Sequence, residues 1–301
     1  MSCHRRDDWL ASVRGWSRYV WNYESSANQN RYGRYSSYGM LQLFTQGDPN
    51  AADSGYVEPG WDWLRPPGAT VIRVPLESLH TSPVIPRQYT QDSFVGGVAL
   101  EGRHGAWAMR FADPCYEPSF RFRKSVFFVD GTIVCVGSGI TNADAEHPTE
   151  TVLYQVALPE TPERFPLEET VTTQWLLDPV ANGYYFPQAQ AVRLLAHHQR
   201  SMHNSAASET EGDFALAWID HGAAPNDAGY VYAMRPKTSA AAMEQYAAAP
   251  DFTLLQQDDA AHIVVFPAAG ITAAALFEPS EDLRHGPVRS VSAPCLVMTR
   301  Q

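Results

Sequence analysis

The chain has 301 residues, of which 45% are hydrophobic and 18% charged, with a formal net charge of -11. This composition is typical of a folded globular protein and excludes a disordered chain. No apolar run approaches the roughly 20 residues of a membrane-spanning helix, and the acidic balance argues against nucleic acid as a partner. The first residues are charged without an apolar run behind them, so no signal peptide is expected there.

The first third of the chain is irregular in pattern. Residues 1–45 are rich in arginine, tyrosine and tryptophan, and the apolar spacing between Trp9 and Val20 fits a helix or a strand, which leaves both open. Residues 46–59 have the composition of a loop and are the predicted domain junction. Trp61 and Trp63, at alternate positions, are expected to place both rings on one side of an extended segment, and a strand is predicted at 70–74.

From Trp61 onward, short β-branched and aromatic runs separated by turn residues predict an all-β fold, a large antiparallel β-sandwich. The clearest hairpin joins 125–129 to 132–136 through Asp130-Gly131, which favours a type I′ turn. Later strands are predicted at 215–219, 230–234, 262–266 and 273–278. One helix is predicted at 240–249, capped by Thr238-Ser239 and ended by Pro250. Residues 143–150 and 200–212 are predicted to be polar loops.

Cysteine and histidine spacings do not indicate a metal site. The cysteines are widely scattered, and two of them, Cys135 and Cys295, lie in apolar runs that predict buried free thiols. The histidines at 197, 198 and 203 have no acidic partner at a standard ligand spacing. No cofactor is required and no metal ligand is predicted, while a structural calcium ion is left open, with no ligands assigned to it.

Two groups of polar residues are candidates for chemistry. Arg14 and Arg18 are four residues apart, which places them on one face of either a helix or a strand, and paired guanidinium groups suit a carboxylate. Glu101 ends an apolar run between glycines, as at the rim of a cleft. His104, three residues later, is a candidate substrate-binding residue.

Further candidates are suited to sugar recognition because they combine aromatic faces with polar groups. These candidate substrate-binding residues are Asn30, Arg34, Tyr35, Trp61 and Trp63. For each of them, packing in the protein interior is the alternative explanation.

Several segments together resemble polysaccharide lyase family 8, the chondroitin, hyaluronate and xanthan lyases, and among them the chondroitin ABC lyases. They occur in the family's order from His4 to Met298. The segments are His4-Arg5-Arg6, Arg14-Gly15-Trp16-Ser17-Arg18, Asn30-Arg31-Tyr32-Gly33-Arg34-Tyr35, Gly60–Thr70, Leu100-Glu101-Gly102, Lys124-Ser125-Val126, Gly137-Ser138-Gly139-Ile140 and Ala217-Trp218-Ile219-Asp220-His221.

The resemblance implies a fold and a division into domains. Residues 56–301 would form the family's central sandwich, a galactose-mutarotase-like supersandwich. Residues 1–55 would be the tail end of a preceding α/α-toroid domain and its linker. The family's Asn, His and Tyr that perform acid–base chemistry lie on that toroid and have no counterpart in this chain, which is therefore expected to be inactive alone.

The resemblance also implies a reaction, β-elimination of uronic-acid polysaccharides. Arg14, Arg18 and Glu101 would be catalytic, with the glutamate orienting a histidine and an arginine, although some chondroitin ABC lyases carry lysine where Arg18 stands. The three are expected to converge on one concave edge. The implied partners are an acidic polysaccharide (chondroitin or dermatan sulfate, or hyaluronan) and the toroid, with no nucleic acid or membrane. The implied location is extracellular or periplasmic.

Two other functions remain open from the sequence. A non-catalytic carbohydrate-binding or structural module would need no toroid. A mutarotase-like epimerase would need a histidine and a glutamate facing each other across the sandwich, and His221 is the candidate histidine.

Overall fold

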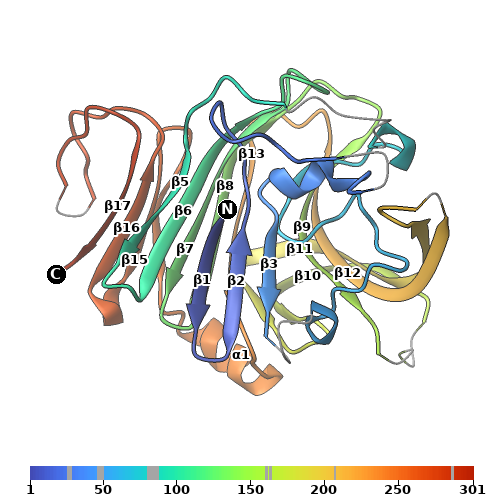
Figure 1. The fold of residues 1–301 in the computed structure, drawn as a ribbon. Coiled ribbons are helices and arrows are strands. Elements are labelled where there is room, and N and C mark those ends of the chain that lie inside the picture. Colours follow the sequence, from blue (N-terminus) through green and yellow to red (C-terminus); the bar gives the residue numbers. More distant parts are fainter. Residues whose placement is uncertain are drawn as a thin grey trace.

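The computed structural model describes residues 1–25, 29–45, 51–79, 88–159, 162, 165–206, 208–285 and 288–301. In these residues the chain folds into three antiparallel sheets and a single α-helix (Figure 1). The predicted all-β class is therefore confirmed. None of the described helices is long and apolar enough to cross a membrane.

The largest sheet has ten strands in the order β4-β9-β12-β11-β13-β8-β7-β6-β5, with β10 paired to β11. Its strands are β4 (Thr70–Ile72), β5 (Val95–Leu100), β6 (His104–Ala112), β7 (Arg121–Val129), β8 (Thr132–Thr141), β9 (Pro148–Ala157), β10 (Leu167–Leu177), β11 (Gly183–Met202), β12 (Glu209–Ala223) and β13 (Ala228–Arg235). Strand β5 is the edge of this sheet, hydrogen-bonded to β6 alone among the described strands.

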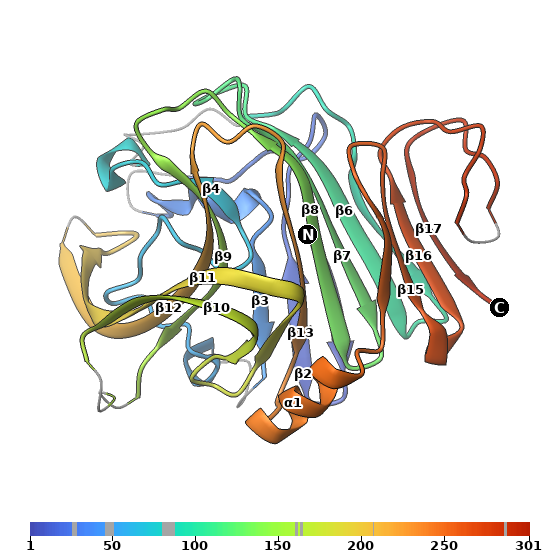
Figure 2. The same ribbon diagram turned by 180° about the vertical axis from the view of Figure 1, so that it is seen from behind.

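Two smaller sheets flank the large one. One consists of β1 (Ser2–Arg6), β2 (Trp9–Val13) and β3 (Leu41–Phe44), and the other of β14 (Thr253–Gln257), β15 (Ala261–Phe266), β16 (Ile271–Leu276) and β17 (Cys295–Arg300). The helix α1 (Ala240–Ala248) lies at one end of the molecule (Figure 2). Short 3-10 helices occur at Gly33–Ser37, Ala51–Ser54, Leu76–Ser78 and Pro267–Ala269.

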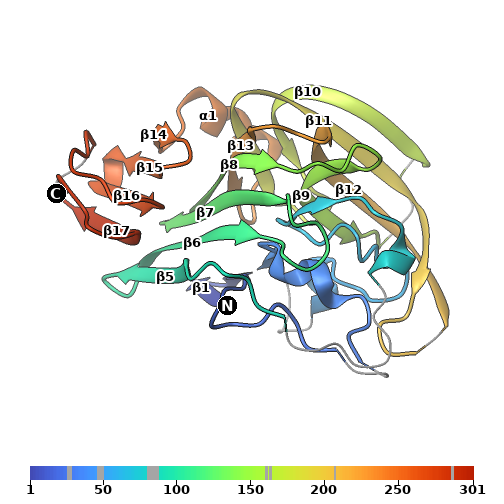
Figure 3. The ribbon, with the colours of Figure 1, turned by 90° about the horizontal axis from the view of Figure 1, so that it is seen from above.

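Alternation along β6, β7 and β8 assigns each side chain to one of two cores. Trp107, Val126 and Ile133 belong to the core shared with β1–β3 and the long loops. Their neighbours Ala108 and Phe127 belong to the core shared with β14–β17. The large sheet is thus the middle layer here, with a smaller sheet on each face (Figure 3).

Most local predictions agree with the structure. β7 and β8 form the predicted hairpin, with Val129 paired to Thr132 across a two-residue loop. The predicted type I′ geometry is wrong, because only Asp130 (φ 50°) and not Gly131 has a positive φ. Helix α1 begins after Ser239, whose side chain accepts a hydrogen bond from the Ala242 N–H.

Loop predictions were less accurate. Strand β9 begins at Pro148, inside the loop predicted at 143–150. Strand β11 continues to Met202 and β12 begins at Glu209, so only the middle of the loop predicted at 200–212 lies outside the strands. The polar C-terminal end of β11 and the polar N-terminal end of β12 are strands because they pair with each other, as between Arg200 and Glu211. Residues 46–50 of the predicted junction lie outside the described residues.

The N-terminal region, which the sequence left open between helix and strand, contains strands β1, β2 and β3. The predicted domain boundary near residue 55 stays a prediction. All four cysteines are free thiols; Cys135 is buried as predicted, and Cys295 is half-buried.

A buried lysine fastens the loops to the large sheet. Lys124 on β7 is 0% exposed, and its Nζ donates to the Gly39 carbonyl at 2.7 Å and to the Gly68 carbonyl. Burial lowers its pKa to about 8. A Cβ at Gly39 (φ 83°) would lie 2.7 Å from the lysine chain, so glycine is required at this contact. This clamp helps to place the segment that carries the candidate site.

Candidate functional site

A cavity of about 260 Å³ gathers four of the predicted site residues: Arg14, Asn30, Trp61 and Trp63. Further lining residues are Met1, Ser12, Tyr32, Gly33, Ser36, Met40, Gln42, Tyr56, Pro66 and Asn204. Aromatic rings therefore occur beside amide, hydroxyl and guanidinium groups, a combination that suits a polar ring-shaped ligand. We call it the aromatic cavity.

Arg14 enters this cavity from the end of β2. Its backbone N–H donates to Met40 O at 3.0 Å, and its Nη2 donates to Asn22 O at 2.9 Å. Burial lowers the pKa of Arg14. Because a guanidinium has five N–H donors, several remain available to a bound anion.

The other three residues are held more firmly. Asn30 has a left-handed backbone (φ 51°), and its Nδ2 donates to Glu24 O at 2.6 Å. Trp63 is 8% exposed, and its Nε1 donates to Met202 O, while Trp61 is 2% exposed. The tryptophan segment is a turn and not a strand, yet both rings line the same cavity as predicted. They form a wall with little exposed ring surface, and their contact with a sugar stays a prediction.

Arg34 and Tyr35 are interior residues, which argues against their predicted contact with substrate. They are 5% and 1% exposed. The Arg34 guanidinium lies 3.7 Å from the centroid of the Tyr116 ring and donates to Ser78 O at 3.2 Å. The Tyr35 hydroxyl donates to Ile72 O at 2.5 Å. Their burial agrees with the alternative of packing in the protein interior, and their contact with substrate stays a prediction.

Arg18 is exposed but does not line the cavity. Its backbone N–H donates to Asp92 O at 2.7 Å, and its guanidinium carbon lies 5.3 Å from the centroid of the exposed Tyr19 ring. The expectation that Arg14 and Arg18 share a face is not supported, because regular structure ends at Val13 and the spacing argument needs a helix or strand.

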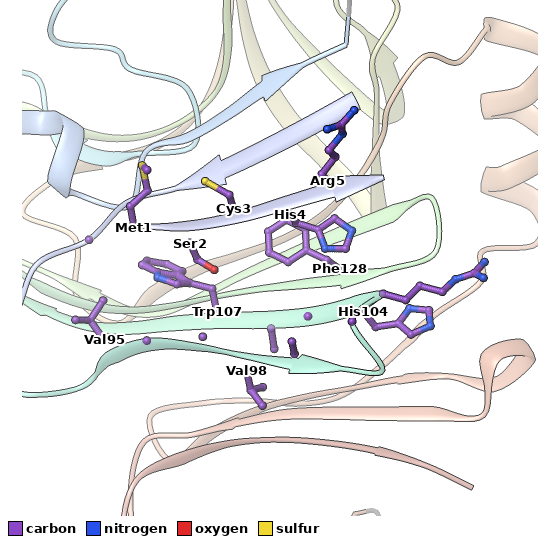
Figure 4. A pocket seen from close by; sticks show the side chains of 18 of the residues that line it. Met1, Ser2, Cys3, His4, Arg5, Val95, Val98, His104, Trp107 and Phe128 are labelled. Atoms are coloured by element: carbon purple, nitrogen blue, oxygen red, sulfur yellow. The ribbon is translucent and has the colours of Figure 1, made fainter. Parts of the chain in front are cut away.

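A groove of about 480 Å³ adjoins the aromatic cavity, and Met1 lines both. It lies between β1 and the β5–β6 hairpin, where Ser2 and His4 point toward Trp107 and Phe128 and Arg5 points to the other side of β1 (Figure 4). Its lining residues are Met1, Ser2, Cys3, His4, Arg5, Gly15, Val20, Val95, Gly96, Gly97, Val98, Ala99, Gly102, Arg103, His104, Gly105, Ala106, Trp107 and Phe128.

Glycines let a ligand approach the backbone in this groove. A Cβ at Gly96 would meet nothing within 4 Å, whereas one at Gly97 would approach Ser2 Oγ at 3.1 Å. β5 is also the open edge of the large sheet. The groove is therefore a shallow channel with exposed peptide groups along one side.

Glu101 lies at the far end of the groove from Arg14 and Arg18, so their predicted convergence is wrong. Gly15 abuts Val95, since a Cβ there would lie 3.1 Å from the valine. From Val95 to Glu101, β5 and its turn extend about 20 Å at about 3.3 Å per residue. A strand carries its two ends apart, and the sequence alone did not show which end meets the arginines.

Other arginines surround Glu101. Arg300 Nη2 lies 3.0 Å from Glu101 Oε2, and Arg6 and Arg103 each lie 3.2 Å from Asp130 Oδ1. Three arginines, Arg6, Arg103 and Arg300, thus meet the carboxylates Glu101, Asp130 and Asp7 here. This end of the groove thus carries no excess of negative charge, unlike the chain as a whole, whose formal net charge is -11.

Two histidines lie beside this cluster. His104 is 3% exposed, and burial lowers its pKa. His4 stacks on Phe128 with ring centroids 4.7 Å apart, and burial lowers its pKa to about 4. Both imidazoles are thus neutral near pH 7. A direct contact between His104 and substrate stays a prediction.

The epimerase hypothesis receives no support from the geometry. The Nε2 of His221 lies 2.9 Å from the Thr151 hydroxyl, and no glutamate contact of His221 is found among the described residues. The buried Glu150 on the neighbouring strand pairs instead with Arg65 at 2.7 Å. Among all the residues that the structure describes, no three His, Cys, Asp or Glu side chains are grouped so that they could hold a metal ion.

Comparison with known proteins decides the family. The model of the polysaccharide lyase family 8 super-sandwich domain matches residues 1–247. The chain belongs to polysaccharide lyase family 8.

Similar lyases cover the whole of the chain. It is 35% identical to a chondroitin sulfate ABC exolyase of Bacteroides thetaiotaomicron over 100% of its own length and 31% of the relative's. It is 31% identical to a chondroitin sulfate ABC endolyase of Proteus vulgaris over 99% of its own length and 31% of that relative's length. The chain thus spans about a third of the length of these relatives.

Solved lyase structures share the fold. The chondroitin AC lyase of Streptomyces coelicolor A3, in complex with chondroitin sulphate, superposes with a TM-score of 0.81 at 27% identity, covering 99% of this chain and 39% of that one. The predicted β-sandwich of a family 8 lyase is therefore confirmed.

Sequence reasoning missed the arginines at the Glu101 end. Arg6 lies in the motif His4-Arg5-Arg6, which was noted but given no role, and the alternation along β1, which puts Arg6 on the same side as His4, was the available signal. Arg300 could not be found, because it reaches Glu101 only through the packing of β17 near β5 and β6.

Proposed function

We propose that this chain forms the sandwich wall of the substrate cleft in a lyase that cleaves uronic-acid-containing glycosaminoglycans of the chondroitin type by β-elimination. The observation that carries the proposal is the groove of about 480 Å³ with arginines at both ends of an acidic protein. Family membership and the chondroitin lyases among the relatives support the reaction and the substrate class.

In this proposal the arginines receive the acidic groups of the glycan. Arg14 and Arg18 lie beyond one end of the groove and Arg103 lines the other, so a chain lying along β5 meets cations at two points. Charge-assisted bonds from guanidinium groups to carboxylate or sulfate oxygens are short and directional. They also neutralise the uronate carboxylate, which makes the adjacent carbon acid easier to deprotonate.

The acid and base come from elsewhere in this proposal. The Asn, His and Tyr of an α/α-toroid domain would face the groove and move the protons, with Glu101 as an orienting carboxylate. Since the substrate is a polymer of the extracellular matrix type, the place of action would be extracellular or periplasmic, which cell fractionation would test.

Binding of chondroitin sulfate oligosaccharides to the chain, measured by titration calorimetry, tests the proposal. We expect weak, roughly millimolar affinity, corresponding to about 4 kcal/mol. The substitutions Arg14→Gln and Arg103→Gln should each weaken it about five- to tenfold, since a charged hydrogen bond contributes about 1.5–3 kcal/mol before screening.

Arg200→Gln is the matched control, because Arg200 is 78% exposed and pairs loosely with Glu211 at 3.8 Å on β11 and β12. It should leave the affinity unchanged. Equal losses in all three variants would indicate non-specific charge attraction and contradict a site in the groove.

A further inference from the structure

One nitrogen atom joins the small sheet of β14–β17 to the end of the groove. The Nη2 of Arg300, at the end of β17, lies 3.0 Å from Glu101 Oε2 and 2.8 Å from His104 Nε2. Glu101 belongs to the turn between β5 and β6, and His104 begins β6. A residue nearly 200 positions away in the sequence thus contacts both side chains.

The chemistry of the three groups fixes where the protons lie. A guanidinium can only donate, so His104 Nε2 must accept from Arg300 and the neutral imidazole carries its proton on Nδ1. The 3.4 Å contact of the Asp130 N–H with Nδ1 is then too long and has the wrong polarity to be a hydrogen bond. Burial, and to a smaller degree the charges of Arg300, Arg103 and Arg6, lower the pKa of His104, while Asp130 raises it.

The turn itself leaves Glu101 in need of an anchor. Its backbone is left-handed (φ 57°), a conformation that a residue with a side chain disfavours, and Gly102 follows with φ 64°. The side chain of Glu101 is 48% exposed. A half-exposed carboxylate on a two-residue left-handed turn would adopt several rotamers if Arg300 did not hold it.

We propose that Arg300 is a positioning residue of the groove, which fixes the carboxylate of Glu101 and holds the His104 ring in one orientation. The small sheet is then part of the site, because β17 supplies the residue that orders the groove's end. This inference rests on the proposed function only in assigning Glu101 and His104 to the glycan groove. The link between Arg300 and His104 can be tested without any glycan.

The first test is the imidazole titration of His104, followed by NMR in the folded 301-residue chain. Arg300→Gln removes the positive charge and replaces the guanidinium with a shorter neutral amide, so it should raise the pKa of His104 by about 0.5 or more. Arg300→Lys keeps the charge and should restore most of the original value. The control Arg200→Gln should change nothing, and thermal unfolding shows which variants are folded.

An unchanged His104 titration in folded Arg300→Gln would overturn the proposal. If Arg300→Gln does not fold, the comparison of Arg300→Lys with the original chain still decides. A lysine cannot hold both partners at guanidinium geometry, so the His104 ring resonances should broaden or shift, and identical spectra would contradict the proposed contact.

The second test is a double-mutant cycle on affinity for chondroitin sulfate oligosaccharides. If Arg300 acts through Glu101, then Glu101→Gln, Arg300→Gln and the double variant should change the affinity by a similar factor. Losses that multiply would show that Arg300 binds the glycan independently and would overturn the positioning role. Absence of glycan binding by the original chain would contradict the proposed function, while the titration of His104 would still decide the role of Arg300.

Discussion

His262 shows how a single buried polar residue joins two layers of the sandwich. It is 0% exposed on β15, and its ring lies between Ser125 of β7 (2.8 Å) and Ser138 of β8 (2.9 Å). The Ser138 hydroxyl donates to Asp258 O, so it must accept from His262 Nε2–H. The Nδ1 therefore accepts from Ser125, and every proton in the chain of bonds is assigned.

This assignment predicts a specific cost for Ser125→Ala. The variant leaves a buried imidazole nitrogen without a donor, which should lower the free energy of unfolding by about 1–3 kcal/mol. Urea denaturation measures the change. Ser290→Ala, at an exposed position, should stay within about 0.5 kcal/mol of the original chain, and an equal effect of both would refute the assignment.

Buried histidines also predict how stability depends on pH. Burial lowers the pKa of His221 to about 4, whereas an unfolded histidine titrates near 6.5. Between these values the unfolded state binds the proton and the folded state does not, so stability is fully present above about pH 6.5 and falls as the pH is lowered toward 4.

We expect His221→Gln to reduce the loss of unfolding free energy between pH 7 and pH 5. The difference in slope should approach about 1.4 kcal/mol per pH unit near pH 5, the linkage of one proton. Urea titrations of both proteins at several pH values provide the measurement. Parallel curves would mean that His221 titrates normally in the folded chain.

At the scale of elements, α1 depends on Ser239, the residue that caps its N-terminus. The helix has nine residues from Ala240 to Ala248, too few to be stable in isolation, and only Met243 is buried within it. Its Ser239 cap satisfies the Ala242 N–H at 3.3 Å. The packing of Met243 and this cap therefore hold the helix against the sheet.

Ser239→Ala should lower the free energy of unfolding by about 0.5–2 kcal/mol, whereas Ser239→Asp should preserve it, because aspartate also caps and its charge suits a helix N-terminus. Circular dichroism during urea denaturation distinguishes the two. Equal loss in both variants would show that the side chain at 239 contributes through packing and not through the cap.

At the scale of the whole molecule, a net charge of -11 opposes the approach of an anionic polymer to a groove edged with arginines. Long-range repulsion is screened beyond about 8 Å at physiological salt, while contacts in the groove are shorter than that. The local arginines therefore decide whether the glycan binds once salt is present.

We expect the chain alone to bind chondroitin sulfate oligosaccharides without cleaving them, because our proposal assigns the acid and base, which contribute factors of about 10²–10⁴ each, to an α/α-toroid domain. Ultraviolet absorbance of the unsaturated product measures turnover. Adding a separately expressed α/α-toroid domain should restore it, and robust activity of the chain alone would contradict the division of roles.

The sequence by itself determined the class of the fold and many of its elements. β-branched runs, the two-residue loop after Val129 and the Ser239 cap are local signals, and each corresponds to an observed element because local sterics and hydrogen bonds act between near neighbours. The family could likewise be recognised, since its motifs keep their order along the chain.

Only the tertiary structure decided which residues share a site. Arg14 and Glu101 looked like partners, but β5 and its turn extend about 20 Å from Val95, beside Gly15, to Glu101. Arg300, in contrast, reaches Glu101 at 3.0 Å from the other end of the sequence. Arg34 and Tyr35 looked like a binding surface, but packing buried them. Strand pairing and side-chain burial are long-range properties, and spacing along the chain does not encode them.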